Sequence, residues 1–405
     1  MLKKEASHLL RKVTSCMGIR LIWYKGISDK IFITLYAFTP YTSIPLYLKV
    51  IFLTALIFLS FNSFAQEQSE VFLKGAAVTD IAEEEGFLWV ATYGQGIYRY
   101  SIADGKWMNY STKSGNLSDD LFYAVEVSKN FVWAASVEGL FTLTKKVNRW
   151  DKRKFAQGGE FGNWIRSLKY DEKQNVLWIG RFRNITRFDL KTRQYEDIDR
   201  TQGTDQKSNT IKSIELDGDS LIWFGTESGV HIYNKKKKHT DPSAWRYFTN
   251  KSKAFKEEGK TVSVSKILFE GRNIWFGTDE FITVEEPDFN LGGVYIHDRR
   301  FNWDRIYKRD GLGGNGIYSL CRIGNYIWVG VYEFDKLQKL EYGKGLYIIN
   351  RVTRQVTPVD LNELDITSSS ILSFHFDGTN IWIGTGEGLI KLKIDNRLAE
   401  WPKKK

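Results

Sequence analysis

Seven tryptophans recur along the chain in nearly the same local sequence, with Leu, Ile or Val before each one and an apolar residue and then Gly or Ala after it. These residues are Trp89, Trp133, Trp178, Trp223, Trp275, Trp328 and Trp382. Consecutive tryptophans are 44, 45, 45, 52, 53 and 54 positions apart, so one unit recurs with a period that lengthens toward the C-terminus. A unit this short cannot bury its own faces and must stack on its neighbours.

The first of these units contains four short segments with the sequence pattern of β-strands. Residues 77–82 and 96–101 alternate apolar and polar side chains, and residues 87–92 are almost continuously apolar. The turn Asp104-Gly105, which favours a tight hairpin, precedes a fourth segment at residues 106–110. The other units repeat this order. The pattern predicts an all-β fold, a seven-bladed β-propeller of four-stranded antiparallel blades.

The repeat also indicates the domain organisation. It runs almost to the end of the 405 residues and predicts one ring over residues 66–405, preceded by a leader at residues 1–65. The leader carries eight basic and two acidic residues, which leaves 50 basic and 46 acidic residues in the remainder. The net charge of the predicted ring is therefore only about +4. The net charge of +10 for the whole chain is no evidence for nucleic-acid binding. We expect the basic run at residues 235–238 to be a solvated hairpin tip.

The leader has the features of an export signal. Residues 50–65 are uncharged, begin with an apolar core of about ten residues and end with Ser63-Phe64-Ala65, a small-residue cleavage site. That core is shorter than the roughly 20 residues of a membrane-spanning helix. However, the preceding segment is longer than a usual signal-peptide n-region, and residues 31–48 are also uncharged. We expect either a downstream translation start with a cleaved signal, giving a periplasmic or cell-surface protein, or an uncleaved leader that anchors the chain to the inner membrane.

The unit signature and the linkers between units together resemble a known repeat. Ile381-Trp382-Ile383-Gly384-Thr385 followed by Gly388-Leu389, and linkers such as residues 310–320, are similar to the two-component regulator propeller repeat. The resemblance covers about residues 71–402. It implies a periplasmic ligand-sensing propeller of the kind found in bacterial hybrid histidine kinases. We expect this chain to have no kinase modules, and the resemblance therefore implies no phosphotransfer by these residues.

The sequence leaves two ways to close the ring. Residues 397–401 are suited to be the fourth strand of the seventh blade, whereas residues 71–74 are suited to pair there instead and join the two ends of the chain. Either arrangement removes free sheet edges.

The longest connections indicate a binding face. In a propeller, the links between blades and the turns between the second and third strands emerge on the same face. Long examples occur at residues 155–163, 201–208, 251–260, 279–291 and 331–342. Long loops on a rigid scaffold are common recognition sites, so we expect the ligand to bind on this face.

Eight residues on this face are candidate ligand contacts. Arg181 and Arg183 replace the usual small residues of a turn and are suited to hold a carboxylate, sulfate or phosphate. Aromatic side chains near the same rim are suited to stack on a sugar, and acidic residues of the long loops are suited to meet a cation or a basic partner. These further candidates are Tyr93, Trp164, Tyr332, Asp279, Glu280 and Glu333.

The function we expect is an exported, non-enzymatic binding or sensory propeller. Its partners would be a small molecule or glycan, or a protein such as a separate sensor kinase, with no nucleic acid and a possible membrane tether through the leader. No cofactor or metal motif is present in the sequence, and we expect none to bind. The alternative is a polysaccharide lyase or glycosidase in which Asp279 and Glu333 face each other across the channel as acid and base.

Overall fold

A computed structural model of the chain describes residues 20–25, 31–36, 69–155 and 159–394. The chain divides into two units, Met1–Gln66 and Glu67–Lys405. In the first unit, β1 (Arg20–Lys25) and β2 (Ile31–Tyr36) form an antiparallel pair. The predicted signal core and cleavage site at residues 50–65 lie outside the described residues. Within those residues, no helix combines the length and apolar composition that crossing a bilayer requires.

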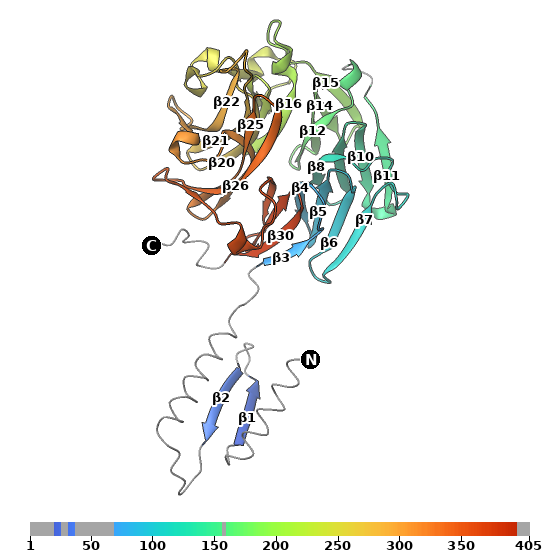
Figure 1. The fold of residues 1–405 in the computed structure, drawn as a ribbon. Helices are drawn as coiled ribbons and strands as arrows, with labels where there is room; N and C mark the ends of the chain where they lie inside the picture. The colour runs from blue at the N-terminus through green and yellow to red at the C-terminus, as the bar shows by residue number, and fades with distance from the viewer. Residues whose placement is uncertain (1–19, 26–30, 37–68, 156–158, 395–405) are drawn as a thin grey trace. The chain divides into compact units, whose positions relative to one another are not determined.

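The second unit consists of seven four-stranded antiparallel sheets arranged in a ring, which confirms the predicted seven-bladed β-propeller (Figure 1). The innermost strands of blades one to seven are β4 (Val78–Glu84), β8 (Phe122–Val127), β12 (Ile165–Asp171), β16 (Ile211–Asp217), β20 (Val264–Glu270), β24 (Gly316–Ile323) and β28 (Ile371–Phe376). The second strands are β5 (Phe87–Thr92), β9 (Phe131–Ser136), β13 (Val176–Arg181), β17 (Leu221–Thr226), β21 (Asn273–Phe281), β25 (Tyr326–Asp335) and β29 (Asn380–Thr385).

The outer half of each blade has the same antiparallel order. The third strands are β6 (Ile97–Ser101), β10 (Gly139–Thr144), β14 (Ile185–Asp189), β18 (Gly229–Asn234), β22 (Asn290–His297), β26 (Leu340–Asn350) and β30 (Gly388–Lys393). The outermost strands are β7 (Lys106–Tyr110), β11 (Arg149–Arg153), β15 (Gln194–Ile198), β19 (Trp245–Phe248), β23 (Trp303–Ile306), β27 (Val356–Pro358) and, in blade seven, β3 (Ser69–Phe72). In the first blade, the four strands agree with the sequence prediction to within two residues at every boundary.

Short 3-10 helices occupy several of the connections. They are η1 (Lys145–Val147), η2 (Gly159–Phe161), η3 (Gln206–Asn209), η4 (Pro242–Ala244), η5 (Asn250–Ser252), η6 (Phe255–Glu257), η7 (Lys308–Asp310) and η8 (Asn362–Leu364). The links at residues 155–163, 201–208 and 251–260, which were predicted to be long, contain η2, η3, η5 and η6.

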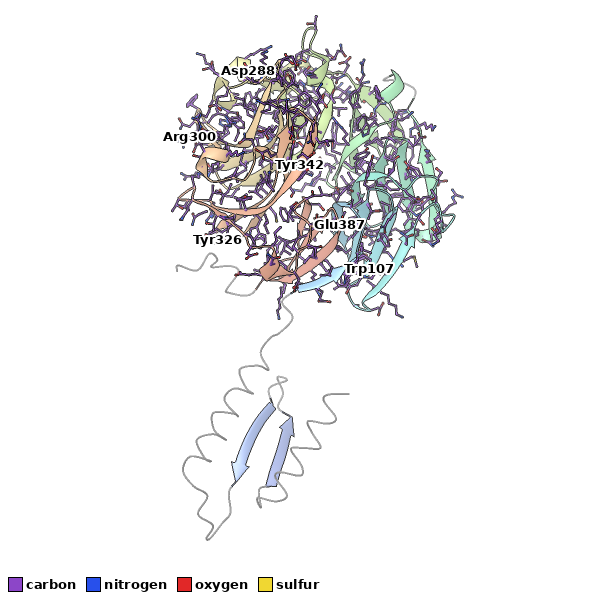
Figure 2. All side chains as sticks on the ribbon, viewed as in Figure 1. Trp107, Asp288, Arg300, Tyr326, Tyr342 and Glu387 are labelled. Carbon is purple, nitrogen blue, oxygen red and sulfur yellow. The ribbon has the colours of Figure 1, made fainter. Side chains whose placement is uncertain are left out.

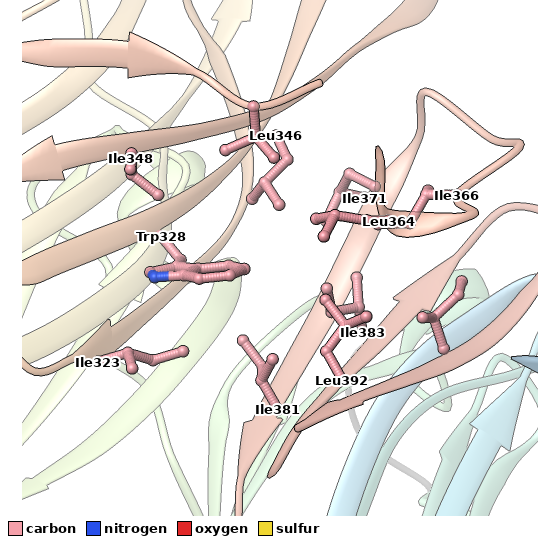
Figure 3. Close-up of a cluster of buried hydrophobic side chains, with 12 residues drawn as sticks. Ile323, Trp328, Leu346, Ile348, Leu364, Ile366, Ile371, Ile381, Ile383 and Leu392 are labelled. Carbon is pink, nitrogen blue, oxygen red and sulfur yellow. The ribbon is translucent and has the colours of Figure 1, made fainter. Parts of the chain in front are cut away.

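The seven repeated tryptophans lie between neighbouring blades, as their sequence setting predicts. Each is at most 3% exposed, and each belongs to a different one of the seven hydrophobic clusters of the ring. Figure 3 shows the cluster between blades six and seven, where Trp328 faces Ile371, Ile381 and Ile383 of the next blade. A large aromatic side chain at this place buries much apolar area and sets the spacing between the two sheets.

In five of the seven blades a glycine follows the tryptophan motif, and close packing between blades requires it. At Gly330, a Cβ atom would overlap the backbone carbonyl oxygen of Ile371 in blade seven, and at Gly384 it would overlap Ser373 and crowd Val78 in blade one. The second strand therefore lies so close to the next blade that only a hydrogen atom fits between them. Blades one and two have Ala91 and Ala135 at this position, paired with Asp80 and Ala124.

The N-terminal segment of the second unit closes the ring. Strand β3 pairs antiparallel with β30, with Val71 opposite Ile390 and Phe72 opposite Leu389. The ring of Phe72 lies 5.8 Å from that of Trp382, and Glu70 forms a 2.9 Å ion pair with Lys391. The structure thus selects the N-terminal alternative, two residues earlier than the sequence predicted. Residues 397–401, the other alternative, lie outside the described residues.

Two features of the sequence prediction need correction. The segments 279–291 and 331–342 are not loops between short strands, because β21, β22, β25 and β26 extend into them as two long hairpins. In the basic run, Lys236, Lys237 and Lys238 are exposed as expected, but Lys235 is buried. Its Nζ lies 2.6 Å from Oδ2 of buried Asp171 in blade three, so this charge forms an ion pair between blades and is not solvated.

Candidate functional site

Every innermost strand has a β-bulge at the same place, within its first three residues. The bulged residues are Thr79, Tyr123, Arg166, Lys212, Ser265, Tyr318 and Leu372. A bulge redirects a side chain out of the regular alternation of the strand. The hydroxyl groups of the bulged Thr79 and Ser265 each donate a hydrogen bond to the next blade. Thr79 donates to the carbonyl oxygen of Phe122, and Ser265 donates to that of Ile317. Larger side chains occupy the equivalent positions of blades two, three, four, six and seven.

The bulged residues of three blades line a cavity in the central channel. This channel cavity has a volume of about 300 Å³ and receives residues from all seven innermost strands. Tyr123, Arg166 and Lys212 contribute to its wall at the level of the bulges. Asp80, Glu126, Lys169, Glu215 and Lys266 also line it, so the wall is largely charged.

The charged groups of the channel cavity influence one another. Lys169 lies 2.8 Å from Glu215, and this carboxylate raises the pKa of Lys169. Burial raises the pKa of Glu126 to about 7, against an opposing effect of Lys169. Burial likewise raises the pKa of Asp80. The channel cavity therefore contains two carboxyl groups that are harder to ionise than usual beside a lysine that stays charged.

Five aromatic side chains form a continuous arc at the rim of blades one to three. This aromatic arc consists of Tyr93, Tyr123, Phe161, Trp164 and Phe182. Neighbouring ring centroids are 5.6 Å apart for Tyr93 and Tyr123, 5.9 Å for Tyr123 and Trp164, and 5.2 Å for Trp164 and Phe182. Phe161 lies 5.1 Å from Phe182 and 6.3 Å from Trp164, so these three rings form a cluster at one end of the arc. Tyr93 and Phe161, at the two ends of the arc, are 48% and 45% exposed.

The aromatic arc adjoins the channel through Arg166. Its guanidinium lies 4.8 Å from the ring centroid of Trp164 and 5.4 Å from that of Phe182. The same group forms a 2.6 Å ion pair with Glu227 of blade four. In the next blade, Lys212 forms an ion pair with Asp279 of blade five. The two cations at the channel rim are thus each neutralised by a carboxylate from the following blade.

A second cavity, here called the hairpin cavity, lies beside these ion pairs under the long hairpins of blades five and six. It has a volume of about 270 Å³ and is lined by Lys207, Lys212, Glu227, Ser263, Asp279, Glu280, Phe281, Phe289, Asn290, Tyr332 and Glu341. Asp279 accepts hydrogen bonds from Ser263 and Tyr332. Burial opposes ionisation of Asp279, but the ammonium of Lys212 and the hydrogen bond from Ser263 outweigh it and lower the pKa of Asp279. Desolvation and the charge of Asp279 raise the pKa of Glu341.

The structure separates the two arginines that the sequence analysis paired. Arg181 is fully buried in blade three, where it donates a 2.8 Å hydrogen bond to the carbonyl of Gly162 and forms a 2.6 Å ion pair with Asp197. Arg183 is exposed. The two guanidinium groups therefore share no exposed surface, because Arg181 holds the link before β12 against the blade.

The other predicted site residues differ in how accessible they are. Tyr93 and Trp164 belong to the aromatic arc, and Asp279 lines the hairpin cavity. Tyr332 also lines this cavity, but it is only 2% exposed and its ring stacks on that of Tyr318 at 4.4 Å, so the prediction that it stacks on a sugar at the rim is wrong. Glu280 also lines the hairpin cavity but is mostly buried, accepting hydrogen bonds from the side chain of Asn315 and the backbone N–H of Phe334. Glu280 thus ties the two hairpins together.

Glu333 lies outside this arrangement. It forms ion pairs with Lys308 and Lys344, which lower its pKa, and it does not line the cavity that contains Asp279. Asp279 and Glu333 therefore do not face each other as predicted. The carboxyl group of Glu341 lines the same cavity as Asp279. Over the described ranges, no group of three His, Cys, Asp or Glu side chains is placed to hold a metal ion.

Sequence reasoning missed Tyr123, Phe161, Arg166, Phe182, Lys212, Glu227 and Glu341. A signal for three of them was present at one repeated position. The innermost strands contain Phe-Tyr-Ala, Ile-Arg-Ser and Ile-Lys-Ser at residues 122–124, 165–167 and 211–213, with a different middle residue in each. The middle residue is the bulged one, and it varies because it faces the rim while its neighbours pack between blades.

Comparison with known proteins finds similarity both to signalling proteins and to an enzyme. No family model matches the chain. A histidine kinase, Histidine kinase P4 of Formosa agariphila, is 23% identical over 190 residues, which are 43% of this chain. The extracellular domain of the BT4673 one-component system of B. thetaiotaomicron is similar in structure over 81% of this chain, with a TM-score of 0.61 and 18% identity. Virginiamycin B lyase of Staphylococcus aureus is similar over 81% of this chain, with a TM-score of 0.57 and 11% identity.

The chain spans only part of the two signalling proteins. It covers 13% of the histidine kinase and 40% of the BT4673 structure, whereas it covers 99% of the lyase. At these identities, the structural similarities establish the propeller fold, which supports many unrelated functions.

Proposed function

We propose that this chain is an exported, non-enzymatic sensory propeller that binds a glycan at the rim of its central channel. The aromatic arc is the observation that carries the proposal. Aromatic rings offer apolar faces on which the carbon-bound hydrogens of a sugar ring can pack. The centroids of successive rings lie 5.1–5.9 Å apart, a spacing similar to the length of one sugar unit in an extended chain. We propose that the arc receives several consecutive units.

The charges at the rim favour binding of a neutral or weakly acidic glycan over a strongly acidic one. Arg166 and Lys212 are already neutralised by Glu227 and Asp279, which weakens their attraction for a free anion. Arg183 is exposed next to Phe182 in the chain and supplies a positive charge for an acidic substituent. We infer binding in preference to catalysis because Asp279 and Glu333 are each paired with lysine and do not share a cavity.

The similarity to a histidine kinase and to an extracellular domain of a one-component system supports a signalling context. We propose that the chain works outside the cytoplasmic membrane and passes the signal to a separate sensor kinase.

Binding of oligosaccharides to the full chain tests this function. We expect calorimetry with a panel of neutral and uronic-acid oligosaccharides to find a ligand whose affinity rises with chain length over the first few units. Trp164→Ala should weaken binding of that ligand about tenfold. Stacking of a nucleic-acid base on one aromatic side chain contributes about 1–3 kcal/mol, and we expect packing of a sugar ring on Trp164 to contribute a similar amount. Phe301→Ala, which removes an aromatic side chain that is 91% exposed elsewhere on the ring, is the matched control. Failure of the whole panel to bind, or equal weakening by the control, would contradict the proposal.

A further inference from the structure

The long hairpins of blades five and six carry a concentration of exposed apolar side chains. Five large hydrophobic residues are exposed there, namely Phe281, Val284, Leu337, Leu340 and Tyr342. Leu337 is 76% exposed. Figure 2 labels Asp288 and Tyr342, one on each hairpin. Apolar side chains gathered on projecting elements and surrounded by polar residues are typical of protein interaction sites.

The two hairpins form one surface because they are joined to each other. The rings of Phe281 and Phe334 lie 4.8 Å apart. Glu280 of the first hairpin accepts a hydrogen bond from the backbone N–H of Phe334 in the second. We call this joined area, residues 279–291 and 331–345, the hairpin surface.

The hairpin surface has an excess of acidic residues. Its two segments contain eight acidic and three basic residues, a net charge of −5, and three lysines outside the segments pair with carboxylates of the surface: Lys212 with Asp279, Lys260 with Glu286 and Asp288, and Lys308 with Glu333. Together with these lysines the net charge is −2. The remaining excess of negative charge favours a basic partner over an acidic one.

The hairpin cavity opens beside this surface and combines aromatic rings with carboxylates. Phe281 and Phe289 line it together with Asp279 and Glu341. An ammonium group is already bound against one of these rings, because Nζ of Lys207 lies 4.0 Å from the ring centroid of Phe289. Lys207 is an exposed residue of η3. Aromatic faces beside carboxylates are a common environment for ammonium ions.

We infer that the hairpin surface docks a protein segment that inserts a lysine side chain into the hairpin cavity, with apolar residues on either side covering Leu337, Leu340 and Val284. The ammonium of that lysine takes the place of Lys207 over Phe289 and donates hydrogen bonds to Glu341. The cavity, at about 270 Å³, lies just below the roughly 300–1,000 Å³ of pockets for larger ligands and suits one inserted side chain. Apolar contacts around a single buried anchor are the usual organisation of a protein interface.

Capped peptides test this inference on the full chain. The probe is a five-residue peptide with lysine at the centre and leucine at the other positions, and the matched probe has acetyl-lysine at the centre, which removes the charge. We expect the lysine peptide to bind at least about tenfold more tightly, as measured by calorimetry. Equal binding of the two peptides, or no binding of either, overturns the inference.

Substitutions with opposite expected effects sharpen the test. Glu341→Gln should weaken the lysine peptide about tenfold, whereas Lys207→Met should strengthen it because the competing ammonium is removed. Leu337→Ser with Leu340→Ser should weaken both peptides, and Val352→Ser, an exposed apolar residue on blade six away from the hairpins, should weaken neither. Thermal unfolding of each variant shows whether it is folded. Weakening by Lys207→Met, or by Val352→Ser as strongly as by the leucine changes, overturns the inference.

The outcome is independent of the proposed glycan function. The same variants can be titrated with oligosaccharides, and Glu341→Gln should leave binding to the aromatic arc unchanged. Peptide binding without glycan binding would leave this inference standing and refute the proposed function, and the reverse result would do the opposite.

Discussion

Nη1 of Arg166 in blade three lies 2.6 Å from Oε1 of Glu227 in blade four, and this ion pair connects the aromatic arc to the hairpin cavity. The guanidinium packs against Trp164 on one side, while the carboxylate lines the cavity on the other. The charge that this part of the rim offers to a ligand is therefore set by the pair and not by Arg166 alone.

Glu227→Gln is expected to change the ligand preference of the rim. Without the carboxylate, the positive charge of Arg166 is no longer neutralised, and a uronic-acid oligosaccharide should bind more tightly relative to its neutral counterpart, by about threefold to tenfold at low salt. Calorimetry at two salt concentrations measures the ratio, and the gain should shrink as salt screens the charge. An unchanged ratio would show that Arg166 does not meet the ligand.

Stability should depend on pH through Glu126. Its pKa is raised to about 7 in the folded protein, above the ordinary value of 4.5, so the folded state binds more protons than the unfolded state between these values. Unfolding free energy should consequently fall as pH rises from about 5 to 7, by up to roughly 3 kcal/mol from this group. Glu126→Gln should flatten this part of the pH profile. Denaturant unfolding at pH 5, 6, 7 and 8 tests the expectation, which fails if the variant retains the full slope.

Lys235→Met should strongly destabilise the ring. It leaves the buried carboxylate of Asp171 without its 2.6 Å partner, and removing one member of a buried ion pair typically costs about 3–5 kcal/mol. The double variant with Asp171→Asn should recover part of the loss because no uncompensated charge remains. Lys236→Met, one residue away and exposed, is the control and should change stability by less than about 0.5 kcal/mol. Thermal melting of the four proteins decides between these outcomes.

Gly330→Ala should destabilise the contact between blades six and seven. Its added methyl group overlaps the carbonyl oxygen of Ile371, a backbone atom that cannot rotate away, and such overpacking costs about 1–3 kcal/mol. Gly386→Ala is a suitable comparison because its nearest contact is the side chain of Ser368, 3.2 Å away, which can move. Similar melting temperatures for the two variants would show that the blades adjust more easily than the packing implies.

The ends of the chain illustrate why sequence reasoning was incomplete. Both the segment before the first blade and the segment after the seventh have apolar and polar residues suited to an outermost strand. Pairing of β3 with β30 depends on where Phe72 can pack, and it packs against Trp382, Tyr100 and Trp107 of blades seven and one. Such a choice rests on contacts between residues about 300 positions apart.

The candidate site, too, was predicted only in part from the sequence. Tyr93 and Trp164 were found from the sequence because aromatic residues in predicted rim connections stand out. Arg181 has the same residue type as Arg183 and lies two positions away, yet it is buried against Asp197 while Arg183 is exposed. The direction of the Arg181 side chain depends on how the sheet of its blade packs. Residue type and spacing in the sequence do not reveal this packing.

The seven tryptophan motifs by themselves determined the fold, because each apolar second strand with a wedge-like aromatic residue needs a neighbouring sheet to cover it. Because seven such units follow one another along the chain, each sheet is covered by the next, and the series closes into a ring. Only the tertiary structure decided which side chains meet at the rim. Lys212 and Asp279, for example, are 67 positions apart and pair because a β-bulge turns the lysine toward the channel rim while the next blade brings the carboxylate to it. Local sequence carries the strand pattern, but contacts between blades depend on how the sheets stack.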